Sequence, residues 1–251
     1  MLETHLQHFT DDITRARALL THAGTQPAGR IHDDIVRSAW MFAVGAVDAY
    51  FSDAYASLVA KTLQAKETEP AVIIPDRLMN LKIPAVAVLT QAQGGWRWRM
   101  AARALIEDEN VLSLTKIQQL FNQFFRKNHK LLNTDTIEPW VLHRDSKMRF
   151  FGISKTAYGA LTPQQKGTEK KKALVHFDEH FEPIFQRRHD CIHNCDRPKA
   201  ALQPITATAT EKAVYDLEFL VSRCHEMFNS EYPIYLQNIG FNAVTRNRVT
   251  Q

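Results

Sequence analysis

Residues 31–66 read IHDDIVRSAWMFAVGAVDAYFSDAYASLVAKTLQAK and contain no proline and only one glycine, Gly45. Apolar or small side chains recur here at intervals of three and four residues, as on one face of a helix; they are Ile35, Ala39, Phe42, Ala43, Ala46, Ala49 and Tyr50. Asp33 or Asp34 in the first turn suits the helix dipole. The stretch therefore predicts one long scaffold helix, with small residues that let a second helix approach closely.

The sequence on either side also has mainly helical patterns. Residues 2–22 have helix-forming composition, and a Gly- and Pro-containing segment, 24–29, separates them from the scaffold helix. Residues 67–79 read as a loop, 134–160 give no clear pattern, and 164–172 read as an exposed basic loop or helix start. Further helices are predicted at 97–108 and 113–130, the second from a wide apolar stripe typical of a core helix.

The C-terminal third carries recognisable helix boundaries. Pro183 fits the first turn of a helix that runs to His193, because proline lacks only an N–H that is unpaired there. Asn194 can adopt the left-handed conformation that ends a helix, and Pro198 prevents the helix from resuming. Thr208 and Glu211 have the spacing of a capping box at the start of a last helix, which continues to about residue 230.

Composition and charge restrict the class of protein. The chain has 251 residues and a formal charge of +4. It has three cysteines, which are few and cannot all be paired, so a disulfide framework is not expected. Its first residues lack a signal-peptide pattern, and the apolar run at 83–89 is too short to span a bilayer. We therefore expect a soluble, cytoplasmic protein with no membrane partner.

The segment RRHDCIHNCDRP, residues 187–198, holds an arginine and a histidine five positions apart, Arg188 and His193. His189 is the polar residue after the arginine, and Asn194 follows the histidine. This arrangement between two strong helices resembles the HEPN family, in its RiboL-PSP and toxin-like group. The stretch WMFAVGAVDAYFSDAYASLVAKTL, residues 40–63, is similar to the small-residue-rich first core helix of that family.

The resemblance implies an all-α helical bundle of HEPN type. The core helices would then cover approximately 2–66 and 176–230, with 67–175 as an inserted, mostly helical elaboration. The whole chain, 1–251, would be a single domain.

The same resemblance implies a metal-independent endoribonuclease that needs no cofactor and cleaves RNA through its own 2′-hydroxyl. His193 would act as general acid and base, because histidine exchanges protons near neutral pH. Arg188 would hold the phosphate with paired N–H donors, and His189 would orient or polarise the pair. The expected substrate-binding groups are Arg187, Asn194, Lys170, Lys171 and Lys172. The biological setting it implies is a toxin or phage-defence effector, with an antitoxin or regulatory protein as a partner.

Helix geometry adds a constraint on how the motif works. Positions five apart lie about 140° apart around a helix, so Arg188 and His193 do not share a face. HEPN nucleases commonly pair two motifs across a dimer interface, and the resemblance therefore implies a homodimer with a composite active site.

Some members of the family carry a tyrosine two residues after the motif histidine, and a partner enzyme modifies that tyrosine. This chain has Cys195 at the corresponding position. The alternative to a nuclease is a non-catalytic module that binds a nucleotide or a protein.

Other interpretations of nearby residues remain open. The histidines and cysteines around the motif, together with His176 and His180 upstream, suggest a zinc-binding site, because imidazole and thiolate groups are the usual ligands of zinc. On a helix, however, the pair His189 and His193 points about 160° away from the pair Cys191 and Cys195, so one ion could not bind all four.

Two other stretches have competing interpretations. Arg17 and His22 match the Arg–His spacing as well, but without a polar follower or a suitable downstream helix, and we treat that match as chance. GGWRWRMAAR, residues 94–103, interleaves tryptophan and arginine as single-stranded RNA binding does. A partly buried helix start is the favoured interpretation of this segment.

Overall fold

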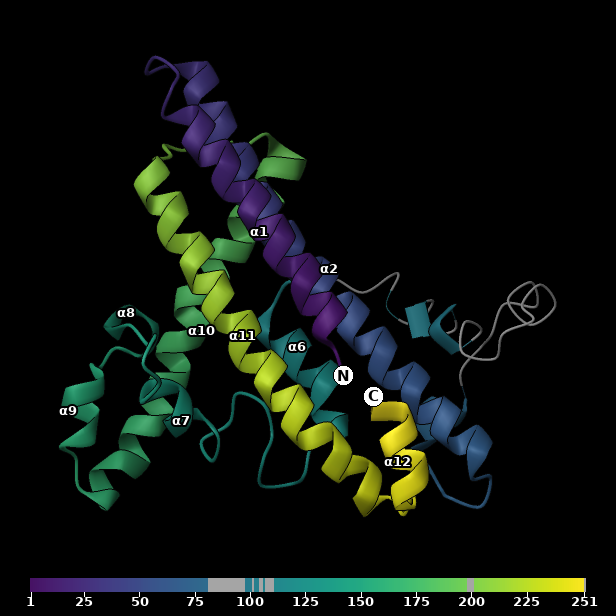
Figure 1. Ribbon diagram of the computed structural model, residues 1–251. Coiled ribbons are helices and arrows are strands. Elements are labelled where there is room, and N and C mark those ends of the chain that lie inside the picture. Colours follow the sequence, from purple (N-terminus) through teal and green to yellow (C-terminus); the bar gives the residue numbers. More distant parts are fainter. Residues whose placement is uncertain (81–97, 101, 104–105, 107–110, 198–200, 251) are drawn as a thin grey trace.

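The structure, a computed structural model, describes residues 1–80, 98–100, 102–103, 106, 111–197 and 201–250. All regular secondary structure in these ranges is helical, which confirms the predicted all-α class. Figure 1 shows an elongated bundle of four long helices: α1 (Glu3–Ala23), α2 (Arg30–Thr68), α10 (Pro163–Asn194) and α11 (Ala207–Asn238). Within the described ranges, no helix has both the length and the hydropathy that crossing a membrane requires.

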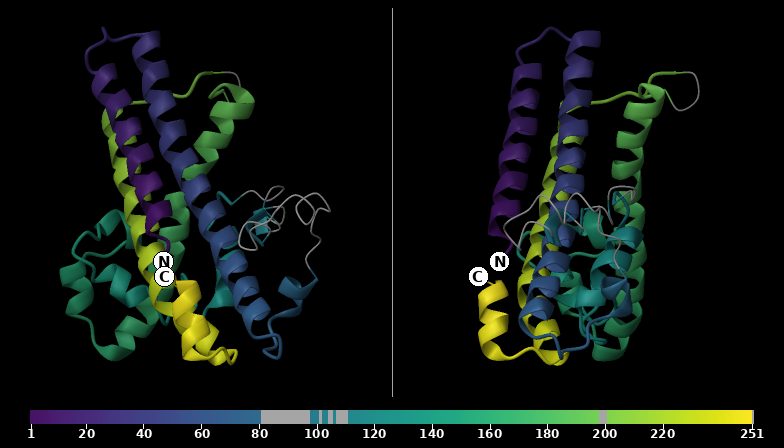
Figure 2. Two further views of the ribbon diagram at one scale, coloured as in Figure 1. Left: turned by 45° about the vertical axis from the view of Figure 1, so that its right-hand side comes forward. Right: turned by 90° about the vertical axis from the view of Figure 1, so that its right-hand side faces the viewer.

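Shorter helices surround this bundle. They are α3 (Asp76–Met79), α6 (Leu114–Phe121), the 3₁₀ helix η1 (Asn122–Phe124), α7 (Ile137–Val141), α8 (Met148–Phe151), α9 (Lys155–Gly159) and α12 (Ala243–Thr250). Helices α7 and α8 pack against α10, whereas α12 packs against α2 and α11 (Figures 1 and 2). The long helices thus form the scaffold, and the short ones cover its lower half.

Helix α2 is the scaffold helix that its sequence predicts. It lies beside α1 over most of its length and also contacts α10, α11 and α12 (Figure 2). Residues 54–60 are buried on every side, as expected for a helix enclosed by others. Alanines at 54, 56 and 60 make this close packing possible because they occupy little volume. The predicted loop at 67–79 begins slightly later than expected, since α2 runs to Thr68, and it contains the short helix α3.

An aromatic cluster joins α6 to the bundle. The ring of Phe121 stacks on Phe228 with centroids 4.3 Å apart and meets Phe51 edge-on at 5.8 Å. The predicted helix at 113–130 is nevertheless wrong beyond η1. Lys130 Nζ donates to the carbonyls of Asn122 and Phe125 at 2.5 and 2.7 Å, which turns the chain back on itself.

The start of α10 differs most from its prediction. Thr162 and Gln165 form a capping box and Pro163 occupies the first turn, twenty residues before Pro183. The core helix therefore begins at 163 and not near 176. Pro183 lies inside the helix, because the buried apolar stripe of Phe177, Phe181, Ile184 and Phe185 continues past it. Tertiary packing on this stripe outweighs the backbone hydrogen bond that an interior proline removes.

Two predicted caps are also wrong. The left-handed residues at the end of α10 are Cys195 (φ 48°) and Asp196 (φ 59°), whereas Asn194 is still helical. The N-cap of α11 is Thr206, whose side chain accepts from the amide of Ala209 at 3.1 Å, so Thr208 forms no capping box with Glu211. The predicted helix at 97–108 is described only in part. Residues 98–100 and 102–103 are helical, residue 106 is in a turn, and the remaining positions lie outside the described residues.

Gly152 ends α8 in the left-handed region, with φ 70°, and lies against the ring of His176. A Cβ at this position would overlap that ring. We expect Gly152→Ala to lower the free energy of unfolding by at least about 1 kcal/mol, the usual cost of a left-handed backbone for residues with a Cβ. Urea denaturation measures the change. Gly45→Ala is the matched control: Gly45 lies within α2 with no atom close to the position of a Cβ, so this substitution should not lower the stability of the protein. Equal stability of both variants would contradict the expectation.

Candidate functional site

The predicted motif occupies the last two turns of α10, where this helix crosses α2. Arg188 is half-buried and its guanidinium lies 3.8 Å from the Oδ2 atom of Asp48 on α2. Burial raises the pKa of Asp48, and the charge of Arg188 acts in the opposite direction. Asp48 is a site residue that the Arg–His motif does not include, and its one local signal is a carboxylate in the otherwise apolar run GAVDAY.

His189 and His193 lie one turn apart on α10, and their rings are in contact, with centroids separated by 4.4 Å. Both side chains are exposed. In the part of the chain that the structure describes, neither imidazole has a hydrogen-bond partner, and the same is true of the Arg188 guanidinium. The three groups are therefore accessible to a ligand.

The structure does not bring Arg188 into contact with His193 within the described chain. Arg188 approaches Asp48, whereas His193 packs on His189. This arrangement agrees with the angle that helical geometry imposes on positions five apart. Asn194, the predicted neighbour, is exposed at the helix end beside His193.

Arg187, a predicted substrate-binding group, makes its contacts inside the fold. Its guanidinium donates to the Asp196 carboxylate at 2.9 Å and to the Pro204 carbonyl at 3.1 Å, and it lies over the ring of Trp40 at 5.4 Å. These contacts hold the Arg187 guanidinium inside the fold, where it is paired with a carboxylate. Arg187 therefore helps to hold the fold together, and its binding of substrate stays a prediction.

Arg187 belongs to a buried polar network that the sequence analysis missed. Asp196 is 1% exposed and accepts from Arg37 Nε at 2.7 Å as well as from Arg187. Arg37 on α2 also donates to the Gln203 carbonyl at 2.8 Å and to Asp34 at 3.1 Å. The network fixes the end of α10 to the start of α2, beside the motif.

The three lysines lie at the opposite end of α10. From Lys170 to Arg188 the helix rises about 27 Å, so these groups do not share a site. Lys170 pairs with Glu138 at 2.8 Å and Lys172 with Glu169 at 3.4 Å, while Lys171 is exposed. Two of the three lysines are thus engaged in surface ion pairs. Their position does not support binding of the phosphates that Arg188 is predicted to bind.

The residues considered for zinc are dispersed. His180 Nε2 lies 2.8 Å from Asp216, which also pairs with Arg149, and His176 packs against Gly152. Burial raises the pKa of Cys191 to about 11, which disfavours the thiolate that metals bind. In the described ranges, no group of three or more His, Cys, Asp or Glu side chains is arranged to hold a metal ion.

The second Arg–His match has a structural explanation. Arg17 on α1 pairs with Glu218 at 2.5 Å and with Glu211 at 3.0 Å, both on α11. These ion pairs join the two helices, which supports the interpretation of this match as chance.

Only part of the tryptophan- and arginine-containing segment lies within the described residues, which exclude Gly94–Arg97 and Ala101. Trp98 is half-buried and donates to Glu67 on α2 at 2.9 Å. Arg103 pairs with Asp53, also on α2, at 2.6 Å. These described contacts fit a partly buried helix better than a free surface for RNA.

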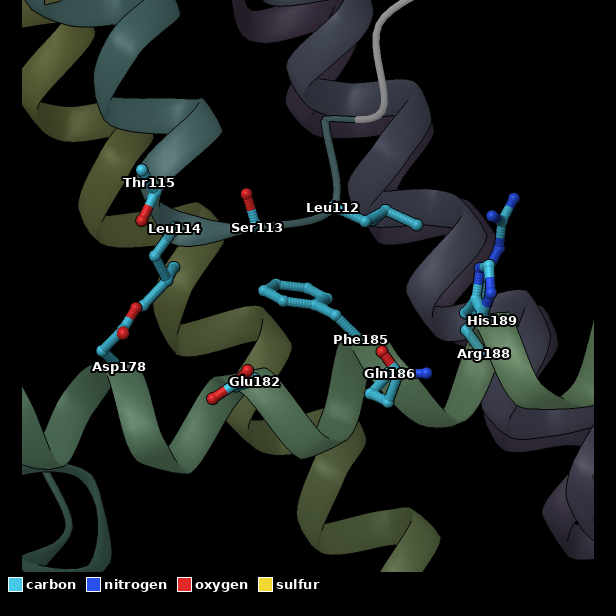
Figure 3. Close-up of a pocket in the computed structure, with 10 residues that line it drawn as sticks. All are labelled: Leu112, Ser113, Leu114, Thr115, Asp178, Glu182, Phe185, Gln186, Arg188 and His189. Carbon is cyan, nitrogen blue, oxygen red and sulfur yellow. The ribbon is translucent and has the colours of Figure 1, made fainter. Parts of the chain in front are cut away.

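A pocket of about 350 Å³ adjoins the motif, between α10 and residues 112–115 at the start of α6. Figure 3 shows Phe185 in the middle of this space, with the start of α6 on the other side. Asp178 and Glu182 line one end, and Arg188 and His189 line the other. No local sequence pattern predicts this pocket, because residues 112–115 reach α10 only through the tertiary fold.

Comparisons with known protein families, with curated proteins and with solved structures give no match to this chain. The arrangement of Arg188, His189 and His193 beside the pocket therefore carries the functional argument.

Proposed function

We propose that the chain is an endoribonuclease that cleaves RNA by attack of the 2′-hydroxyl on the adjacent phosphodiester. The observation that carries the proposal is the set of three accessible groups at the end of α10. They are the Arg188 guanidinium, which approaches Asp48 at 3.8 Å, and two exposed imidazoles on the same two turns of α10 that are in contact with each other. Two proton-transfer groups and one permanent cation are the components that this reaction uses.

The contrast among the arginines at the crossing of α2 and α10 supports this assignment. Arg37 and Arg187 both donate to Asp196 and to backbone carbonyls inside the fold. Arg188 approaches only Asp48 in the described chain, at a distance longer than a hydrogen bond. Its N–H donors are thus free to bind phosphate oxygens, while Asp48 holds the side chain in place.

The reaction needs one proton acceptor and one proton donor. One imidazole of the His189–His193 pair takes the proton of the 2′-hydroxyl as its oxygen bonds to phosphorus. The other gives a proton to the 5′-oxygen as its bond to phosphorus breaks. Arg188 stabilises the charge on the non-bridging oxygens between these events. The products are a 2′,3′-cyclic phosphate and a 5′-hydroxyl, and no oxidant or reductant takes part.

We further propose that the active form is a homodimer. Arg188 and His193 make their contacts on different sides of α10, so a second copy can supply the partner that one chain does not provide. Ile192, 47% exposed between the two histidines, gives this surface an apolar element that a second copy would cover.

The test is to incubate the purified protein with single-stranded RNA and with DNA of the same sequence. We expect cleavage of the RNA alone, with 2′,3′-cyclic phosphate ends identified by mass spectrometry. The reaction should proceed in EDTA, because the proposed step uses side chains only. Cleavage of the DNA at the same rate, or no cleavage of any RNA by folded protein, would overturn the proposal. The second outcome would favour a non-catalytic binding module.

A further inference from the structure

The pocket beside the motif has two chemically different ends along one face of α10. Asp178 and Glu182 are four residues apart, which places their Cα atoms about 6 Å apart along the helix axis and on one face. His189 follows Glu182 by seven residues, two turns along the same face. Figure 3 shows the acidic residues and the Arg188–His189 pair at opposite ends of the pocket, with Phe185 and Gln186 between them.

Among the described residues, no cation pairs with the two carboxylates. In the described part of the chain, neither Asp178 nor Glu182 forms an ion pair or a hydrogen bond. The other ionisable side chains that line the pocket, Arg188 and His189, lie at the far end. Ionised carboxylates only accept hydrogen bonds, so this end is suited to a ligand group that presents N–H donors.

The remaining lining suits a flat ring. The Phe185 ring lies in the middle of the lining, and Leu112 and Leu114 lie across from it at the start of α6 (Figure 3). Unstacked RNA bases bind against apolar and aromatic side chains and are read on their Watson–Crick edges. The volume of about 350 Å³ is near the lower limit of ligand pockets, and so is suited to one nucleotide rather than several.

Among the four RNA bases, guanine places two N–H donors side by side on its Watson–Crick edge, at N1 and N2. Such a pair matches the two oxygens of one carboxylate, in the way that a guanidinium does. Adenine, cytosine and uracil do not offer this adjacent pair. The acidic end therefore favours guanine over the other bases.

We propose that this pocket binds a guanine of the substrate, with Glu182 or Asp178 accepting from N1–H and N2–H. The 3′-phosphate of the same nucleotide then lies at Arg188 and His189. The identity of the substrate as RNA rests on the proposed function, whereas guanine recognition rests on the pocket. The consequence is cleavage on the 3′ side of guanosine.

Calorimetry with guanosine 3′-monophosphate and adenosine 3′-monophosphate tests guanine recognition without any cleavage. We expect the guanine nucleotide to bind at least about tenfold more tightly, as for one bidentate base contact. Glu182→Gln and Asp178→Asn keep the shape of each side chain, and the double variant should lose this preference. Glu179→Gln, which removes a neighbouring charge outside the lining of this pocket, should keep it. Equal binding of both nucleotides to the wild type, or a preference that survives in the double variant, would overturn the inference.

Mapping the cleavage sites in a mixed-sequence RNA separates this inference from the proposed function. Cleavage after guanosine supports both. Cleavage with no base preference overturns the guanine pocket and leaves the nuclease proposal intact. Selective binding of the guanine nucleotide by a protein that cleaves no RNA supports the pocket and overturns the nuclease.

Discussion

Replacing His193 with alanine is expected to lower the rate of RNA cleavage by about 100- to 10,000-fold, the usual contribution of a positioned general acid or base. Arg188→Ala should cost a similar factor, because the negative charge of the phosphorane then lacks its cation. Single-turnover cleavage of a labelled RNA measures both effects. His176→Ala is the matched control: it removes a half-exposed histidine from the same helix, about 25 Å away from His193.

Mixing the two inactive variants tests the composite site. If Arg188 of one subunit acts with His193 of the other, a mixture of Arg188→Ala and His193→Ala chains forms heterodimers with one intact site each. About a quarter of the wild-type activity should then return after subunit exchange. A mixture that stays inactive would place the complete site within one chain. Full cleavage by His193→Ala alone would contradict the proposed role of the histidine itself.

Asp196→Ala is expected to destabilise the protein by about 3–5 kcal/mol, because it leaves the guanidinium group of Arg187 without a carboxylate partner and that of Arg37 with the exposed Asp34 alone. That loss is a large part of the total stability of an ordinary domain. The midpoint of urea denaturation measures it, provided that the slope of the transition is unchanged. Arg37→Ala should also be strongly destabilising, since Asp196 is buried.

The control for this prediction lies in the same network. Asp34 also pairs with Arg37, but its side chain is 58% exposed, so Asp34→Ala should cost no more than about 1 kcal/mol. A loss of equal size in Asp34→Ala and Asp196→Ala would show that burial of the Asp196 carboxylate is not what matters.

The scaffold could be predicted from the sequence because its signals are local. Helices α1 and α2 appear in the spacing of apolar residues, and the break between them coincides with a glycine- and proline-rich segment. The start of α10 was missed for a physical reason: a proline at an internal position looks like a helix start unless the packing around it is known. The apolar stripe from Phe177 to Phe185 holds the helix together across Pro183.

The candidate site was predictable only in part. Arg188, His189 and His193 lie within six residues of one another, so their proximity follows from one helix. Asp48 and residues 112–115 approach them from other elements, and no local pattern specifies that approach. The contacts of Arg187 within the fold also have no local signal. Its partner Asp196 becomes buried only when α10 packs on α2.

The contact between Arg37 and Asp196 also has a consequence for the order of folding. These residues are 159 positions apart, so bringing them together closes a very long loop, which is entropically costly before other contacts form. We therefore expect the end of α10 to become fixed late, after α1 and α2 have paired. A growing chain that has not yet emerged as far as residue 196 lacks this clamp, and its Arg188–His193 segment has no fixed orientation toward α2 until that residue is available.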